Sequence, residues 1–128
     1  MGQPPTLETI RQAERRLLPY IHRTPVLTCS ATNDRVGARL FFKCENFQKT
    51  GAFKIRGASN AVLSLDPAQA EGGVVTHSSG NHGAALSLAA QNRGVSASIV
   101  MPSNTSAVKQ AAVRTYGGKI TFCRPTLQ

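Results

Sequence analysis

Two short segments of the chain carry residue types that could do chemistry, and the first surrounds Lys54. This lysine lies between Gly51 and Gly57, where a loop is expected to lead into a helix. The partial positive charge at a helix N-terminus disfavours the ammonium form of a lysine. The neutral amine can attack an aldehyde and form a Schiff base, and Phe53 could pack on a planar ring. On spacing alone, a solvated surface lysine is the more common outcome.

The second segment, residues 76–83 with the sequence THSSGNHG, joins an expected strand to an expected helix. Ser and Asn are good N-caps, and Gly80 lets the backbone approach a ligand closely. Exposed amides at such a helix start bind phosphate or carboxylate, although an ordinary capped turn fits the pattern equally well. His77 and His82 have no third ligand nearby, so no metal site is expected.

A third segment, residues 116–118, follows a basic stretch that contains Lys109 and Arg114. A basic helix that ends in glycines could face a nucleotide phosphate. A solvated face closed by a Schellman cap is favoured over that interpretation.

Charge is distributed unevenly along the 128 residues. The chain has 15 Lys and Arg against 6 Asp and Glu, a formal charge of +9, and every carboxylate precedes Gly72. The second half therefore cannot supply a carboxylate metal site or acid/base pair, but it suits anionic ligands. The basic residues are dispersed and no RNA-binding or zinc-finger pattern is present, so nucleic acid is not an expected partner.

The location expected from the sequence is the cytoplasm. No run approaches the length of a membrane span, and the first residues lack the apolar core of a signal peptide. Cys29, Cys44 and Cys123 lack CxxC spacing. They are interpreted as free thiols in a reducing compartment, each a small buried hydrophobe.

The elements that must position these segments alternate regularly. Residues 6–18 are expected to form a helix, 24–28 to be extended, 33–34 to be a turn or a short helix cap, and 39–44 to form a strand. Helices over 53–65, 81–92 and 106–116 then alternate with strands over 73–77, 96–101 and 119–123, with Pro67 ending the first of these helices and Gly94 capping the second. This order predicts an α/β fold with a parallel sheet. The last strand lacks a crossover helix after it, and the first helix lacks a partner for its apolar face, which indicates the front part of a larger protein.

Residues 41–58, FFKCENFQKTGAFKIRGA, resemble the signature of the serine racemase and threonine/serine dehydratase family. These are fold-type II enzymes that use pyridoxal phosphate. Residues 24–28, 78–83 and 116–118 agree with the family in order and spacing, so the resemblance covers nearly the whole chain. It implies a tryptophan synthase β-like architecture. Residues 1–45 would be the N-terminal part of the large domain and 46–128 the small α/β domain, with the remainder of the large domain absent.

The resemblance also implies roles for the residues. Lys54 would hold pyridoxal phosphate as a Schiff base and act as the base on one face of the substrate Cα, with Phe53 near the ring and Asn81 bonded to the phenolic oxygen. Many dehydratases carry alanine where this chain has Ser79, which would be the acid/base on the opposite face. The implied activity is racemisation of serine together with elimination of water and ammonia from serine or threonine, with the cofactor as electron sink. The substrate carboxylate would be bound by Ser78, Ser79, Gly80, Asn81 and His82.

In the same family ATP and Mg²⁺ or Mn²⁺ act as activators of the full-length enzyme, and a homodimer is implied. The positions that match the ATP site, close to a subunit interface, are Lys49, Thr50, Lys109, Ala112 and Tyr116. The family's phosphate-binding glycine loop, the polar residue at the pyridine nitrogen and the acidic cation ligands have no counterpart in this chain. The isolated chain is therefore predicted to be inactive or nearly so. The alternative is a non-catalytic truncated form or remnant that serves as an interaction module.

Overall fold

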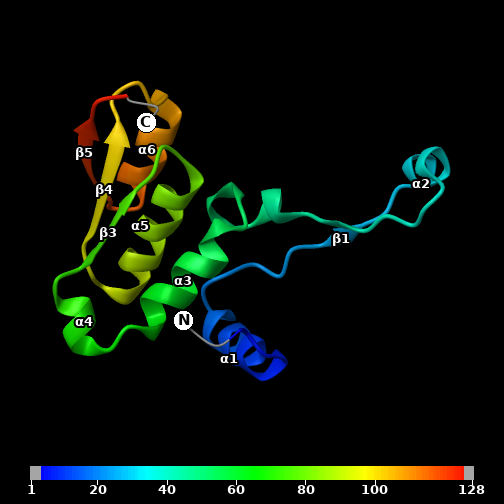
Figure 1. Ribbon diagram of the computed structural model, residues 1–128, viewed down its shortest axis with the longest axis horizontal. Coiled ribbons are helices and arrows are strands. Elements are labelled where there is room, and N and C mark those ends of the chain that lie inside the picture. The colour runs from blue at the N-terminus through cyan, green and yellow to red at the C-terminus, as the bar shows by residue number, and fades with distance from the viewer. Residues whose placement is uncertain (1–3, 126–128) are drawn as a thin grey trace.

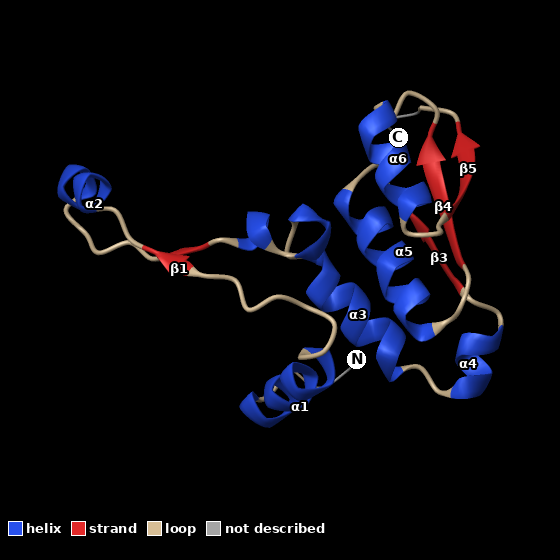
Figure 2. Ribbon diagram, turned by 180° about the vertical axis from the view of Figure 1, so that it is seen from behind, coloured by secondary structure: helices blue, strands red, loops and turns tan. Residues whose placement is uncertain are grey.

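A three-stranded parallel sheet, helices on one of its faces and a long arm make up residues 4–125, the part of the chain that the computed structural model describes (Figure 1). The arm extends away from the sheet and carries a short helix at its tip (Figures 1 and 2). The elements, in chain order, are α1 (Leu7–Leu17), β1 (Val26–Leu27), α2 (Ser30–Val36), β2 (Phe42–Lys43), the 3-10 helices η1 (Glu45–Phe47) and η2 (Lys49–Gly51), α3 (Lys54–Ser64), α4 (Pro67–Glu71), β3 (Val74–His77), α5 (Asn81–Arg93), β4 (Ala97–Pro102), α6 (Ala107–Thr115) and β5 (Lys119–Cys123).

The sheet has the strand order β3-β4-β5, and both neighbouring pairs are parallel. Helix α5 connects β3 to β4 and α6 connects β4 to β5, so both crossovers step in the same direction. Right-handed crossovers of this kind place their helices on the same face of a sheet. The predicted βαβ units and parallel sheet are confirmed.

The core lies between this face of the sheet and the helices. Along β4, Ala97, Ile99 and Met101 are buried and alternate with more exposed residues. Ile99 and the alanines of α5 pack in one cluster with Ile55 and Val62 of α3. Because alanines dominate the buried surface of α5, α3 can pack closely against it.

Helix ends follow from the sequence at several points. Gly94 takes the left-handed conformation, with φ 76°, at the end of α5, as expected for a C-cap. Gly117, also at φ 76°, closes α6, where the Gly118 N–H donates to the carbonyl of Val113 and the Gly117 N–H to that of Arg114. These two bonds form the Schellman cap predicted at residues 116–118.

The start of β5 passes very close to α5. A Cβ atom on Gly118 would lie 2.2 Å from the Ser87 hydroxyl oxygen and 2.7 Å from a methyl group of Val113. Ser87 is buried, and its hydroxyl donates to the carbonyl of Gly83. Only glycine fits at position 118 without displacing these neighbours.

Three expectations about the elements were wrong. Pro67 does not end α3, which stops at Ser64, but is the first residue of α4, where Asp66 and Gln69 form a capping box. Proline is well suited to that position because it needs no hydrogen-bond acceptor there. The strand expected over 39–44 pairs only at β2, and residues 33–34 lie inside α2, so they are neither a turn nor a helix cap.

The arm is poorly covered. Leu27 and Phe42, paired across β1 and β2, are 52% and 45% exposed, and Phe41 is 61% exposed. The three thiols are not buried either: Cys29 is exposed, and Cys44 and Cys123 are half-buried. The expectation that they are buried was wrong. Cys29 and Cys44 lie on the arm or at its base, and Cys123 lies on an edge strand of a sheet that the helices cover on one face only. Within residues 4–125, no helix is both long and apolar enough to cross a membrane.

Candidate active site

Lys54 is the first residue of α3, and its side chain is exposed. Its Nζ lies 4.8 Å from the centroid of the Phe53 ring. Among the described residues, the amine makes neither a hydrogen bond nor an ion pair that would occupy it. The amine is therefore accessible to a carbonyl compound, and the ring beside it offers an apolar surface to a planar ligand.

The loop between β3 and α5 is held from within by Ser78. Its hydroxyl accepts hydrogen bonds from the N–H groups of Gly80, at 3.2 Å, and Gly83, at 3.1 Å. Gly83 itself lies against the sheet, because a Cβ there would lie 3.0 Å from Ile99. The Ser78 hydroxyl thus fixes the shape of this turn, and its hydrogen bonds are made within the turn rather than towards a ligand.

The outer side of the same turn is open. Ser79 and Asn81 are exposed and His82 is half-buried. Gly80 is the N-cap of α5 and provides no side-chain cap, so the first N–H groups of the helix, those of Asn81 and His82, lack intrahelical acceptors. Such groups bind carboxylate or phosphate.

A cavity of about 380 Å³ adjoins this turn, and Lys109 brings a positive charge to it. A Cβ on Gly80 would lie 3.7 Å from the Lys109 Nζ, so the ammonium group sits beside the turn. The cavity is lined by Ser79, Pro102, Asn104, Thr105, Ser106, Lys109 and Pro125. From the family resemblance, Lys109 was expected only among the nucleotide-binding positions. Its place near Ser79 could have been inferred, because loops after parallel strands meet at one edge of the sheet.

Helices α3 and α5 lie side by side and run in the same direction (Figures 1 and 2). Lys54 and Asn81 each begin one of these helices. The two segments with candidate chemistry therefore lie at the same end of the molecule, although the sequence separates them.

The positions that match the ATP site fall on two elements. Lys49 and Thr50 belong to η2, while Lys109, Ala112 and Tyr116 belong to α6 or its C-cap. Both elements contact α5. Thr50 has φ 64°, which is unusual for a β-branched residue, and its buried hydroxyl has no partner among the described residues.

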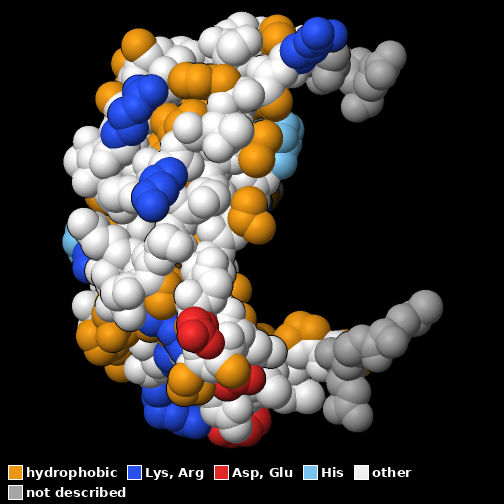
Figure 3. Space-filling model, turned by 90° about the vertical axis from the view of Figure 1, so that its left-hand side faces the viewer, with side chains coloured by type: hydrophobic (Ala, Val, Ile, Leu, Met, Phe, Trp, Pro, Cys, Tyr) orange, Lys and Arg blue, Asp and Glu red, His pale blue; other side chains and the backbone are white. Residues whose placement is uncertain are grey.

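Basic side chains outnumber acidic ones on the part of the molecule that the second half of the chain forms. Figure 3 shows Asp and Glu only in the lower part of the face that it presents, whereas Lys and Arg also lie in the upper part. This distribution agrees with the absence of carboxylates after Glu71. The resulting positive potential favours anionic ligands at the site.

A comparison with protein families matches residues 17–128 to the pyridoxal-phosphate dependent enzymes. The chain belongs to this family. It is 54% identical over 122 residues to beta-hydroxyaspartate dehydratase of Paracoccus denitrificans, covering 95% of this chain and 39% of that protein. It is 55% identical over 121 residues to serine racemase of Oryza sativa subsp. indica, covering 94% and 36%.

Among solved structures, maize serine racemase matches with a TM-score of 0.92 and 51% identity, over 98% of this chain and 38% of that one. The expected membership of the fold-type II pyridoxal phosphate enzymes is confirmed. The chain spans less than two fifths of the length of these relatives.

The residues present fit the reactive end of the cofactor of a pyridoxal-phosphate dependent enzyme. The exposed Lys54 amine can attach its carbonyl carbon, and the exposed Phe53 ring offers a stacking surface. Asn81, exposed at the same end, can donate a hydrogen bond to a phenolic oxygen.

Proposed function

We propose that this chain carries the lysine and the carboxylate-binding turn of a pyridoxal phosphate-dependent racemase and ammonia-lyase that acts on serine or threonine. The observation that carries the proposal is the exposed Lys54 amine, which has no hydrogen-bond or ion-pair partner within residues 4–125 and lies at the same end of helices α3 and α5 as the open turn with Ser79. The names of the relatives, serine racemase and beta-hydroxyaspartate dehydratase, support this class of reaction.

The geometry supports a division of labour among these residues. The amides of Asn81 and His82, with the Lys109 ammonium beside them, would hold the substrate carboxylate. When bound, pyridoxal phosphate supplies the electron sink for loss of the Cα proton. The Lys54 amine would move that proton on one face of Cα, and the Ser79 hydroxyl would do so on the other. Racemisation needs both groups, whereas elimination needs removal of the Cα proton on one face and loss of the β-hydroxyl.

Finer assignments are also proposals. We infer that residues 1–45 belong to the large domain and 46–128 to the small domain, in a cytoplasmic enzyme whose full-length form is a homodimer activated by ATP and Mg²⁺ or Mn²⁺. The Thr50 hydroxyl, buried and without a partner in the part of the chain that the structure describes, supports a nucleotide ligand for Lys49 and Thr50. Lys109, Ala112 and Tyr116 would form the second side of that site. Ser78 and Gly80 would contribute to carboxylate binding through the backbone of the turn, because the Ser78 hydroxyl already accepts two hydrogen bonds within it.

Attachment of pyridoxal phosphate to the purified chain tests the proposal. We expect a visible absorbance band and, after borohydride reduction, modification of the Lys54 peptide but no turnover of L-serine, because the family's phosphate loop has no counterpart here. Lys54→Ala should abolish the modification, and Lys119→Ala serves as the matched control. Equal labelling of Lys54 and other lysines would contradict the assigned role, and turnover by the isolated chain would contradict its predicted inactivity.

A non-catalytic role as an interaction module is the second candidate, and the exposed apolar side chains of the arm favour it. Arm residues Val26, Leu27, Phe41 and Phe42 are each at least 45% exposed. A chain without any Lys54-selective modification that nevertheless forms a stable complex with a full-length serine racemase would support this function instead of the first.

A further inference from the structure

A two-pronged ion pair joins the base of the arm to the first turn of α3. The Arg56 Nε donates to Glu45 Oε2 at 2.8 Å, and its Nη2 donates to Glu45 Oε1 at 2.8 Å. The hydroxyl of Thr24 also donates to Glu45 Oε1, at 2.6 Å. The two charged side chains are 31% and 19% exposed, so water screens this pair less than a pair on the open surface.

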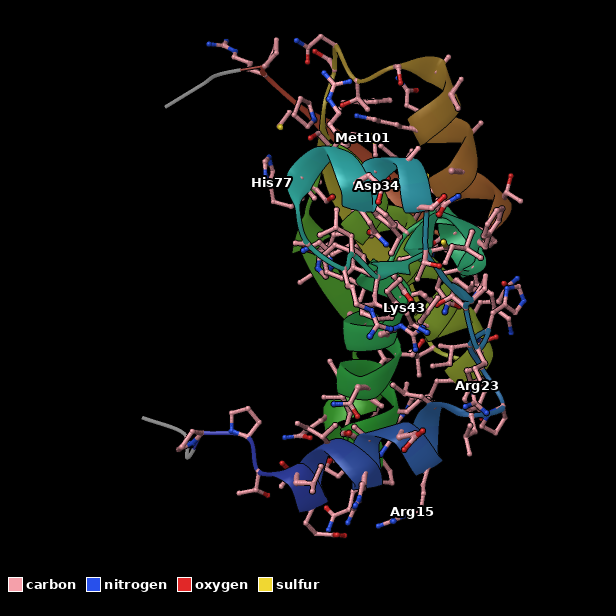
Figure 4. All side chains as sticks on the ribbon, turned by 90° about the vertical axis from the view of Figure 1, so that its right-hand side faces the viewer. Arg15, Arg23, Asp34, Lys43, His77 and Met101 are labelled. Carbon is pink, nitrogen blue, oxygen red and sulfur yellow. The ribbon has the colours of Figure 1, made fainter. Side chains whose placement is uncertain are left out.

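Gln48 makes a second connection between the same segments. It is only 3% exposed, and its side-chain amide pairs with the backbone of His22 in both directions. Gln48 Oε1 accepts from the His22 N–H at 2.8 Å, and Nε2 donates to the His22 carbonyl at 2.7 Å. The same oxygen accepts from the N–H of Lys49. Lys43 Nζ donates a further hydrogen bond to the carbonyl of Thr24, at 2.8 Å. In Figure 4 Lys43 is labelled at mid-height, above Arg15 and below His77.

The start of α3 depends on these connections because it has no cap of its own. Phe53, its N-cap, makes no side-chain hydrogen bond to the helix. The segment before it contains two single-turn 3-10 helices, η1 and η2, and Thr50 inside η2 has φ 64°. Hydrogen bonds in a 3-10 helix have poorer geometry than those in an α-helix. No local signal therefore fixes the direction in which Lys54 leaves the backbone.

We propose that Glu45, Gln48 and Arg56 are positioning residues, which hold the first turn of α3 so that the Lys54 amine points towards the open turn of α5. The inference deepens the proposed function and rests on it. Arg56 lies two residues after Lys54, and Glu45 and Gln48 precede it, so the bonds bracket the lysine on both sides. These three side chains replace the missing cap with a connection to residues 22–24.

Competitive labelling of the lysines tests the proposal. Wild-type chain and the variants Arg56→Gln and Glu45→Gln are treated with pyridoxal phosphate and borohydride, and peptide mass spectrometry gives the ratio of modified Lys54 to modified Lys119. We expect this ratio to fall about tenfold, the equivalent of one hydrogen bond to a charged group. Amide hydrogen exchange should accelerate at residues 54–57 and not in α5.

Matched variants separate positioning from a general loss of structure. Glu8→Gln removes a different ion pair of similar length, the exposed pair in which Arg15 Nη2 lies 3.0 Å from Glu8 Oε1. This variant should leave the labelling ratio unchanged. Arg56→Lys keeps the charge but not the two-pronged geometry, and should restore part of the ratio. Thr24→Val removes one hydrogen bond to Glu45 and leaves the ion pair intact, so it should lower the labelling ratio by a smaller factor. It tests the proposal even if the variants of Glu45 and Arg56 do not fold.

Two results would overturn the proposal. One is an unchanged Lys54 ratio in folded Arg56→Gln or Thr24→Val. The other is an equal change in labelling at all lysines with uniformly faster exchange, which is the pattern of a purely structural role. Wild-type chain that shows no preference for Lys54 would instead refute the proposed function, so the two failures are distinguishable.

Discussion

Ser78 and Ser79 are neighbours with the same side chain and opposite surroundings. The hydroxyl of Ser78 accepts two backbone N–H groups inside the turn, whereas Ser79 is exposed beside the cavity that Lys109 also lines. The sequence motif alone cannot distinguish them, because the difference depends on which way each side chain leaves the backbone at the end of β3.

Alanine substitution should separate these two serines. Ser78→Ala leaves the amides of Gly80 and Gly83 without their acceptor and should lower the free energy of unfolding by about 1–2 kcal/mol, as the loss of a helix cap does. Ser79→Ala should change it by less than about 0.5 kcal/mol. Urea denaturation followed by circular dichroism measures both, and equal losses would show that the Ser78 bonds do not stabilise the turn.

The Glu45–Arg56 pair should make stability sensitive to acid. The pKa of Glu45 falls to about 2, mainly because Arg56 donates hydrogen bonds to it, and the hydrogen bond from Thr24 and the positive charge of Lys43 contribute to this fall. A carboxyl with a lowered pKa stabilises the fold above its ordinary pKa, near 4.3, and this contribution is lost as the pH falls from there towards 2.

Between pH 6 and pH 2.5 the wild-type chain should therefore lose on the order of 2 kcal/mol more stability than Glu45→Gln, which has nothing to titrate at this position. Chemical denaturation at a series of pH values measures the difference. Glu8→Gln, at the exposed pair, is the control and should follow the wild type. Parallel pH profiles for wild type and Glu45→Gln would contradict the assignment.

At the scale of elements, the sequence predicted what local patterns determine. Helix α5 and its Gly94 cap, the Schellman cap at Gly117 and the full extent of β5 all follow from short-range signals. The pairing of β2 could not be predicted, because it depends on a partner of only two residues. The Glu45–Arg56–Thr24 bonds were also missed, since they join segments that only the tertiary fold brings together.

The contact between β5 and α5 should tolerate no side chain at position 118. Gly118→Ala places a methyl group against Ser87 and Val113, and we expect a loss of about 1–3 kcal/mol from overpacking. Combining it with Ser87→Gly removes the nearer neighbour, so part of the loss should be recovered. Thermal unfolding of the single and double variants measures this, and simple additivity of the two losses would contradict direct contact.

At the scale of the whole molecule, the arm and the sheet differ in how they are held. The sheet and its helices share one apolar core, whereas β1, α2 and β2 lie outside that cluster with their large apolar side chains exposed.

The extended arm should be measurable in solution. A compact chain of this length has a radius of gyration of about 14 Å. If the arm keeps its position, X-ray scattering from the monomer should give a clearly larger value and an asymmetric distance distribution. Deleting residues 26–43 should return the value towards that of a compact domain, and a compact result for the intact chain would show that the arm folds back.

Burial of α3 by α5 also sets an order of events during synthesis. Ile55 and Val62 of α3 pack in one cluster with α5, which the ribosome adds later. At roughly 5–20 residues per second, the nascent chain presents the apolar side of α3 for a few seconds before its cover exists. Lys54, at the start of α3, is therefore synthesised before the helix that packs against α3 exists. A chaperone would have most of its opportunity to bind between the synthesis of α3 and that of α5.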